Sequence, residues 1–173
     1  MPKGKPPKPM PAIDAAYLAL ATKLSIKPSG VGIGPEPELS MWKMAVVGHS
    51  YWLWAVGPTR LDPVSDSQAG YNVRLDATLT SVRFEMGDGS VVDCRGGGTP
   101  YPGDEKGLYA KSPTCGYSYA QTSWHQPGGR YMVRMITNWS VGYTTPLGSG
   151  TIPVVLASRR QLEVGELQTV VDR

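Results

Sequence analysis

The stretch that decides the fold class is Tyr131-Met132-Val133-Arg134-Met135-Ile136-Thr137-Asn138-Trp139-Ser140-Val141, the most regular alternation of side chains in the chain. Its odd-numbered positions carry mostly large apolar side chains, whereas its even-numbered positions are more polar. Successive side chains of a strand point to opposite faces of the sheet, so a period of two indicates a strand. We therefore predict a strand over these eleven residues, with one face on a core.

Two shorter alternations precede this strand, at 73–79 and 82–86, and the parity of their apolar positions changes between them. A bend or bulge at 80–81 would keep both sets on the core, because one extra residue reverses the direction of every later side chain. Gly87, Asp88 and Gly89 then provide the backbone freedom of a hairpin turn into a strand at 91–94.

Further apolar runs are separated by turn residues. They lie at 41–56, where a turn at 48–50 divides two short strands, and at 115–119, 151–157, 161–164 and 167–171. Pro153 fits an edge or the start of a strand, because proline donates no backbone hydrogen bond. Glycine and proline, 21 and 16 of the 173 residues, provide the turns. About seven to nine short strands at this spacing are typical of an antiparallel β-sandwich, so we predict a mainly β fold.

The first forty residues lack the alternating pattern that predicts strands in the rest of the chain. Residues 1–11 are rich in proline and lysine and are expected to form an extended, flexible tail. An Ala-rich stretch at 12–24 predicts one amphipathic helix. Its expected apolar stripe is Ile13, Tyr17, Leu20 and Leu24. The predicted organisation is the tail at 1–11, the helix and a Gly/Pro-rich irregular connector at 12–40, and the sandwich at 41–173.

Charge argues against nucleic acid as a partner. The chain has 17 basic and 14 acidic residues, and Lys3, Lys5 and Lys8 of the tail account for the whole excess. The remainder is neutral, so it has no basic face that could neutralise a run of phosphates. Gly30, Gly32 and Gly34 do not match the dinucleotide-binding fingerprint either, because prolines follow where its helix should begin.

The two cysteines, Cys94 and Cys115, lie at the ends of predicted strands on either side of a Gly/Pro-rich loop at 95–114. We expect them to form a disulfide; the alternative is a pair of buried free thiols in a cytosolic protein. A disulfide implies an oxidising compartment, so we expect a secreted or cell-envelope protein. No long apolar run indicates membrane insertion. Met1 leads directly into the tail without an apolar stretch, so this start is either the natural one or follows a removed leader. The expected disulfide favours a removed leader.

Catalytic and metal-binding patterns are weak. His49 and His125 are the only histidines, and both fall in predicted turns where solvation is the usual state. The sequence has no Gly-x-Ser-x-Gly nucleophile elbow. The two histidines and two cysteines also lack the close spacing of zinc ligands, so the sequence does not indicate a zinc site. The acidic pairs in loops are Asp62 with Asp66 and Asp104 with Glu105, and Asp88 with Asp93 flank the hairpin. A calcium site at the last four lacks any recognised spacing. We expect a protein that is not an enzyme and has no cofactor and no metal.

Two linked motifs resemble PKD domains, which are Ig-like β-sandwich repeats of extracellular proteins. Phe84-Glu85-Met86-Gly87-Asp88-Gly89 is similar to their Phe-Gly-Asp-Gly turn, and Pro127-Gly128-Gly129-Arg130-Tyr131-Met132-Val133 to their Pro-Gly-x-Tyr-x-Val strand. Tyr117 and Tyr119 stand where PKD domains have His-Thr-Tyr. The resemblance covers about residues 72–142, and the disulfide loop and the N-terminal helix depart from it.

A longer series of features includes the N-terminal helix and, in chain order, Trp52-Leu53-Trp54, Met86-Gly87-Asp88-Gly89, Thr99-Pro100-Tyr101, Cys115-Gly116-Tyr117 and the terminal stretch 164–171. This series looks like a family of secreted actinobacterial proteins without an established activity. Together these resemblances imply an Ig/PKD-like sandwich and an envelope interaction or structural module, and they supply no catalytic residues.

The leading hypothesis is therefore a non-enzymatic extracellular or envelope module for protein interaction, adhesion or display. Its binding surface is expected to use exposed aromatic rings, although core packing is the alternative explanation for each ring. The candidates are Trp52, Trp54, Tyr101 and Trp124, with Trp42 and Tyr109 beside them. Two other hypotheses are a structural subunit of a surface appendage or virion, which self-assembles through its tail and helix, and a carbohydrate-binding domain.

Overall fold

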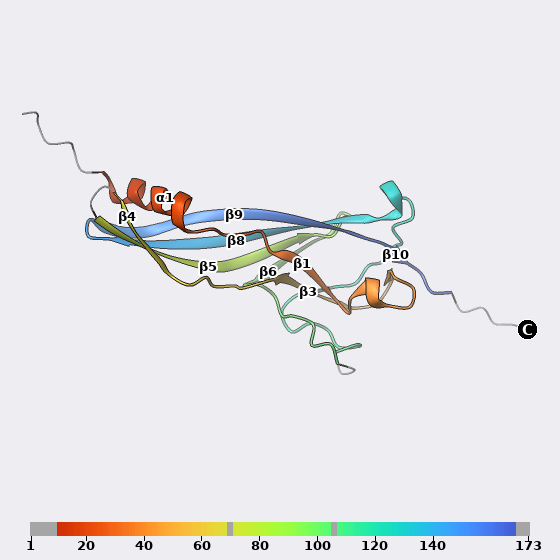
Figure 1. Ribbon diagram of the computed structural model, residues 1–173. Helices are drawn as coiled ribbons and strands as arrows, with labels where there is room; N and C mark the ends of the chain where they lie inside the picture. Colours follow the sequence, from red (N-terminus) through yellow and green to blue (C-terminus); the bar gives the residue numbers. More distant parts are fainter. Residues whose placement is uncertain (1–9, 69–70, 105–106, 169–173) are drawn as a thin grey trace, which may run out of the picture. The chain divides into compact units, whose positions relative to one another are not determined.

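The computed structural model describes residues 10–68, 71–104 and 107–168 (Figure 1). Its residues form two compact units, described separately below. The first comprises Met1–Lys27, Arg60–Thr78 and Trp139–Val154, and the second comprises Pro28–Thr59, Leu79–Asn138 and Val155–Arg173. Strands account for 47% of the chain, and the described residues contain one α-helix. The prediction of a mainly β protein with one N-terminal helix is confirmed.

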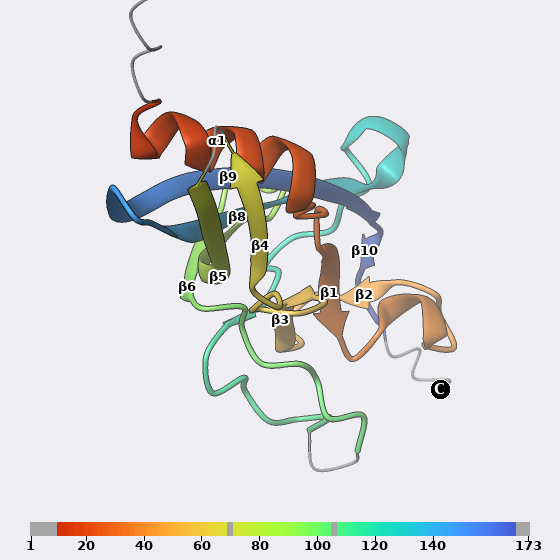
Figure 2. The same ribbon diagram turned by 60° about the vertical axis from the view of Figure 1, so that its left-hand side comes forward.

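The helix belongs to the first unit and packs against a strand of that unit. Helix α1, Ala12–Lys23, lies along β4, Val64–Gln68, as Figure 2 shows. The helix is found where it was predicted, but its apolar stripe is wrong, because Tyr17 is 51% exposed. The buried side chains are Ala15, Ala16 and Ala19. Small side chains let a helix approach its neighbour closely, and the alanine face therefore packs in place of the larger residues.

The larger sheet has the strand order β4-β5-β8-β9, and β6 pairs with β5. Its three long strands are β5, Tyr71–Glu85, β8, Tyr131–Thr145, and β9, Gly148–Leu162, each of which contributes residues to both units. The alternation predicted for 131–141 is confirmed, since odd-numbered positions of β8 are buried up to Val141. Pro153 lies in β9, at the end of this strand order, as expected of an edge strand.

The change of parity in β5 is also confirmed. Leu79 and Val82 are both buried, whereas Thr80 between them is exposed and Ser81 is half-buried. Strand β6, Val91–Arg95, pairs with β5 in antiparallel register, and Glu85 lies opposite Val91. The hairpin therefore turns through 86–90, as the Gly-Asp-Gly sequence predicts.

A second sheet, in the second unit, has the order β1-β3-β7. It contains β1, Gly30–Gly34, β3, Tyr51–Val56, and β7, Gly116–Tyr117. The prediction of an irregular connector throughout 28–40 is thus wrong. Gly32 lies opposite Trp54 in register, and the Trp54 ring occupies the space that a Cβ atom on Gly32 would need. The alternate glycines of β1 therefore form a strand face on which large rings pack.

The outer edge of β1 is covered by side chains of β9. The Ser158 hydroxyl donates a hydrogen bond to the backbone carbonyl of Ser29, and the Arg160 guanidinium donates one to the carbonyl of Val31. These carbonyls lie at the β1 end of the strand order β1-β3-β7.

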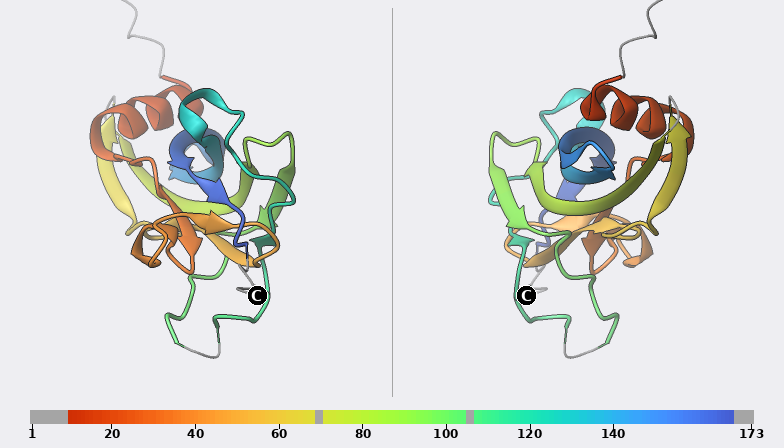
Figure 3. Two further views of the ribbon diagram at one scale, coloured as in Figure 1. Left: turned by 90° about the vertical axis from the view of Figure 1, so that its right-hand side faces the viewer. Right: turned by 90° about the vertical axis from the view of Figure 1, so that its left-hand side faces the viewer.

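A pair of short parallel strands completes the second unit: β2, Ala45–Val46, and β10, Val164–Gly165. The strands predicted at 151–157 and 161–164 are largely one continuous strand, β9. Residues 167 and 168 are not in a strand, and the rest of the strand predicted at 167–171 lies outside the described residues. Two 3-10 turns, η1 at Pro37–Leu39 and η2 at Pro127–Gly129, lie in the connections. Figure 3 shows the β6–β7 loop extending beyond the β1-β3-β7 sheet.

The two cysteines lie at the base of this β6–β7 loop. Cys94 of β6 and Cys115, just before β7, have Cα atoms 5.7 Å apart and sulfurs at bonding distance. Both are buried, and the Cys115 carbonyl accepts a hydrogen bond from the Leu53 amide of β3 at 2.9 Å. The predicted pairing is therefore present, and it joins β6 to the start of β7.

Candidate binding pocket

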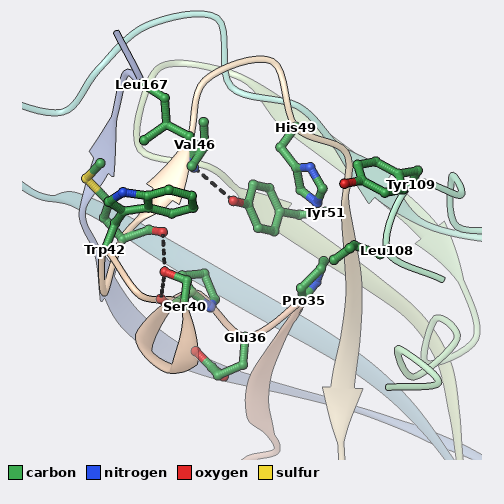
Figure 4. Close-up of a pocket in the computed structure, with 12 residues that line it drawn as sticks. Pro35, Glu36, Ser40, Trp42, Val46, His49, Tyr51, Leu108, Tyr109 and Leu167 are labelled. Carbon is green, nitrogen blue, oxygen red and sulfur yellow. Dashed lines mark hydrogen bonds between the residues drawn. The ribbon is translucent and has the colours of Figure 1, made fainter. Parts of the chain in front are cut away.

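A pocket of about 320 Å³ lies in the second unit, between η1, β3 and the β6–β7 loop (Figure 4). Its lining is mostly apolar and aromatic, which is typical of ligand-binding pockets. The lining residues are Pro35, Glu36, Pro37, Ser40, Trp42, Met44, Val46, His49, Tyr51, Leu108, Tyr109 and Leu167. In Figure 4, Trp42 and Leu167 lie on one side of the Tyr51 ring, and His49 and Tyr109 on the other.

The turn after η1 exposes one wall of the pocket. The single hydroxyl hydrogen of Ser40 is shared between the Pro37 carbonyl at 2.8 Å and the Met44 carbonyl at 3.3 Å, and this bifurcated bond joins both ends of the turn. Lys43 adopts a positive φ of 54° within it. Because the backbone is turned outward here, Met41 is 82% exposed and Trp42 is 50% exposed. These are large apolar surfaces to leave in water, and such surfaces often mark a binding site.

Tyr51 is the central ring of the pocket, and it contacts both the backbone and a neighbouring ring. Tyr51 is buried, and its hydroxyl oxygen accepts a hydrogen bond from the Val46 amide at 2.8 Å. Burial raises the pKa of Tyr51, so the phenol stays neutral and retains its own hydrogen for a ligand acceptor. The His49 ring packs edge-on against Tyr51, with 4.9 Å between ring centroids, and against Tyr109 at 6.4 Å. Burial lowers the pKa of His49, which favours the neutral imidazole in this wall.

The carboxylate of the pocket is already paired. Glu36 forms an ion pair with Arg160, whose side chain is mostly buried. Glu36 also accepts a hydrogen bond from the Glu38 amide at 3.3 Å. Its carboxylate is therefore occupied in holding η1 to β9, and it is poorly placed to act as a free general base. The carboxylate of Glu38 lies 3.9 Å from Arg160 and is 70% exposed.

The aromatic residues predicted to bind a partner divide into two groups. Trp42 and Tyr109 line the pocket together, and Tyr109 is 83% exposed. Trp52 is only 8% exposed, because its indole N–H donates to the Ala110 carbonyl at 2.8 Å and its ring packs edge-on against Tyr101.

The remaining predicted residues lie elsewhere. The half-buried Trp54 packs on Gly32, and Tyr101 packs beside Gly34, so both rings support β1. Trp124 is 61% exposed but does not line the pocket. The pocket therefore unites two of the six predicted aromatic residues, and the others serve packing or stand alone on the surface.

Several pocket residues were not singled out from the sequence. His49 was expected to be a solvated turn residue but is partly buried. Tyr51 and Leu167 were expected only as parts of strands, and Leu108 had no expected role. One signal could have identified this region: Leu39-Ser40-Met41-Trp42-Lys43 places three large apolar residues next to a turn that two prolines set off.

The described carboxylates considered as calcium ligands all form hydrogen bonds or ion pairs with other residues of the chain. Asp88 accepts hydrogen bonds from the Ser90 amide and the Tyr117 hydroxyl, and Asp93 pairs with Arg83 at 3.7 Å. Asp104 accepts from the Gly107 amide at 2.8 Å, whereas Glu105 lies outside the described residues. Within the described ranges, no three histidine, cysteine or acidic side chains group as metal ligands would.

No known protein family matches this chain, and searches of curated proteins and of solved structures likewise returned no match. The described helix is too short to span a membrane. The function must therefore be argued from the pocket itself.

Proposed function

We propose that the chain is a non-enzymatic, extracellular or cell-envelope module that binds a protein partner through this pocket. The observation that carries the proposal is the position of Trp42, which is half-exposed, and Tyr109, which is strongly exposed, on opposite sides of a mostly apolar pocket. Aromatic anchors that fill or frame a pocket dominate the energetics of protein interfaces. A pocket of about 320 Å³ accommodates one or two apolar side chains of a partner.

The chemistry of the lining supports binding over catalysis. Ser40 uses its hydroxyl for two backbone carbonyls, and Glu36 is paired with Arg160. His49 packs between two tyrosine rings, and these contacts place no carboxylate beside its imidazole that would orient it as a base. A nucleophile within reach of an oriented base, which hydrolytic chemistry needs, is therefore not supported by these contacts. The few polar groups also make a sugar a poorer match than an apolar peptide.

The proposal also includes an oxidising compartment and a PKD-like sandwich as the fold. The buried Cys94–Cys115 pair supports an oxidising environment. The Gly-Asp-Gly hairpin and the buried Tyr119 support a PKD-like sandwich as the underlying fold. We therefore propose a secreted or envelope PKD-like module in which the pocket is the partner-binding surface.

Selection of a random peptide display library on the full, oxidised chain tests the binding function. We expect enriched peptides to share an apolar anchor and to lose binding to the Trp42→Ala and Tyr109→Ala variants. Trp124→Ala and Tyr17→Ala are matched controls, because these rings are also exposed but do not line the pocket. Peptides that bind all four variants equally would contradict the proposal. Hits on a glycan array that depend on Trp42 would instead favour a carbohydrate-binding domain.

A further inference from the structure

The tail of the chain has a composition that suits the pocket. Residues 2–9, Pro-Lys-Gly-Lys-Pro-Pro-Lys-Pro, contain four prolines and three lysines and lie outside the described residues. Sequences of this kind favour the polyproline II helix. Pro11, the residue before α1, has φ −56° and ψ 146°, which lie close to this conformation.

Polyproline segments are recognised by grooves lined with aromatic rings. Such a segment has no internal hydrogen bonds, so a groove offers flat rings for its pyrrolidines and donors for its carbonyls. The pocket provides both: the Trp42, Tyr51 and Tyr109 rings line it, and the Tyr51 oxygen accepts from the Val46 amide, so its hydroxyl hydrogen is left for a ligand carbonyl. The half-exposed Trp42 also carries an indole N–H, which can only donate.

The charges beside the pocket complement those of the tail. The Glu38 carboxylate is 70% exposed, in the turn η1 that forms one wall. Arg160 pairs with Glu36 and lies 3.9 Å from Glu38, so the Glu38 carboxylate shares this cation but keeps most of its surface open to an incoming ammonium group. The tail carries the whole net positive charge of the chain, at Lys3, Lys5 and Lys8. A lysine beside a bound proline would form an exposed ion pair with Glu38. Such a pair adds little affinity, but it would help to fix which tail residues lie in the pocket.

We infer that the pocket binds a proline-rich, lysine-bearing segment in the polyproline conformation, and that its occupant is residues 2–9 of a second copy of this chain. The inference rests on the proposed function, because it names the partner of the same pocket. A polyproline segment is semi-rigid, which favours contact with a neighbour over a return to its own chain. Tail-to-pocket contacts are heterologous, so each bound copy leaves a free tail and a free pocket for further copies.

The first experiment measures binding of a synthetic peptide of residues 1–11, labelled with a fluorophore at its C-terminus. The receiver is the full chain with Pro6→Ala, Pro7→Ala and Pro9→Ala, which removes the competing tail but leaves the pocket intact. We expect saturable anisotropy, with affinity reduced about tenfold or more by Trp42→Ala and unchanged by Trp124→Ala. A peptide carrying the same three alanines should not bind, and Glu38→Gln should weaken binding only at low salt.

The second experiment compares sedimentation of the wild-type chain with that of the triple-alanine variant over a range of concentrations. We expect the wild type to associate with concentration and the variant to stay monomeric. A wild type that stays monomeric at every concentration would overturn the second copy as the occupant.

The outcomes separate this inference from the proposed function. If the tail peptide fails to bind while display-selected apolar peptides bind and depend on Trp42, the inference is wrong and the binding module stands. If neither kind of peptide binds, both are wrong. Equal binding of the proline and alanine peptides also overturns the inference, because the polyproline conformation would not be what the pocket recognises.

Discussion

Ser123 and Val164 are joined by two reciprocal hydrogen bonds. The Ser123 amide donates to the Val164 carbonyl at 2.9 Å, and the Val164 amide donates to the Ser123 hydroxyl oxygen at 2.9 Å. Ser123 is completely buried, and its hydroxyl donates in turn to the Gly129 carbonyl at 2.6 Å. Strand β10 is thus held by β2 on one side and by this serine on the other, and Leu167 of the pocket follows soon after.

Replacing Ser123 with alanine should therefore destabilise the protein and loosen β10. The Val164 amide and the Gly129 carbonyl would lose their partners in a buried setting, at a cost of about 1–3 kcal/mol. Urea unfolding measures this loss, and hydrogen exchange should become faster at Val164. The exposed Ser118→Ala is the matched control and should change neither. Unaltered exchange at Val164 in the Ser123→Ala variant would mean that the Ser123 hydroxyl does not hold β10 in place.

Tyr119→Phe should lower the free energy of unfolding by about 1–3 kcal/mol. The Tyr119 side chain is 1% exposed, stacks on Tyr131 with 5.2 Å between centroids, and donates its hydroxyl hydrogen to the Met86 carbonyl at 3.0 Å. The variant keeps the stacked ring but leaves this carbonyl short of a donor. Chemical denaturation measures the difference, and Tyr109→Phe, at a ring that is 83% exposed, should have no effect. Equal stability of the two variants would show that the buried hydrogen bond contributes nothing.

Reducing the Cys94–Cys115 bond should cost about 3 kcal/mol, because the bond closes a loop with a sequence separation of 21 residues. Denaturant titrations with and without a reductant measure the change. Thiol counting in denaturant without reductant is the control and should detect no free thiol. Two free thiols in that assay would contradict the disulfide and remove the main argument for an oxidising compartment.

His49 should make the protein less stable in mild acid. Burial lowers its pKa in the folded chain below the value of about 6.5 expected when unfolded, so the unfolded chain binds more protons between the two values. Stability is therefore full above about pH 6.5 and falls as the pH decreases toward the folded pKa.

Comparison of urea unfolding at about pH 7.5 and pH 5 tests this linkage. His49→Gln should lose less stability than the wild type on acidification, whereas His125→Gln, at an exposed turn residue, should behave like the wild type. An acid sensitivity that is the same in all three proteins would exclude His49 as its source.

The long strands could be predicted from the sequence because their signal is local. In β8 every second residue from Tyr131 to Val141 is buried, and in β5 the parity change between Leu79 and Val82 already appears as two successive polar residues. Strand β1 could not be predicted in this way. Its alternate positions are glycines that leave room for the rings of other segments, so hydrophobic alternation is replaced by the absence of side chains.

The pocket could be predicted only in part. Trp42 and Tyr109 attract notice as aromatic residues among turn residues, but the choice between surface and core depends on distant partners. Trp52 illustrates this, because its burial follows from a hydrogen bond to Ala110, 58 residues away. Tyr51 and Leu167 both line the pocket although they are far apart in the chain, and no local sequence pattern predicts that they lie together.

The side chains that β9 places on β1 have a consequence for solubility. A glycine-rich end strand with free carbonyls would be a template for strands of other molecules and hence for aggregation. Ser158 and Arg160 occupy the carbonyls of Ser29 and Val31, and Arg160 also holds Glu36 beside the pocket. The same guanidinium therefore holds a carboxylate of the pocket and covers a carbonyl at the sheet edge, where a strand of another molecule would otherwise pair.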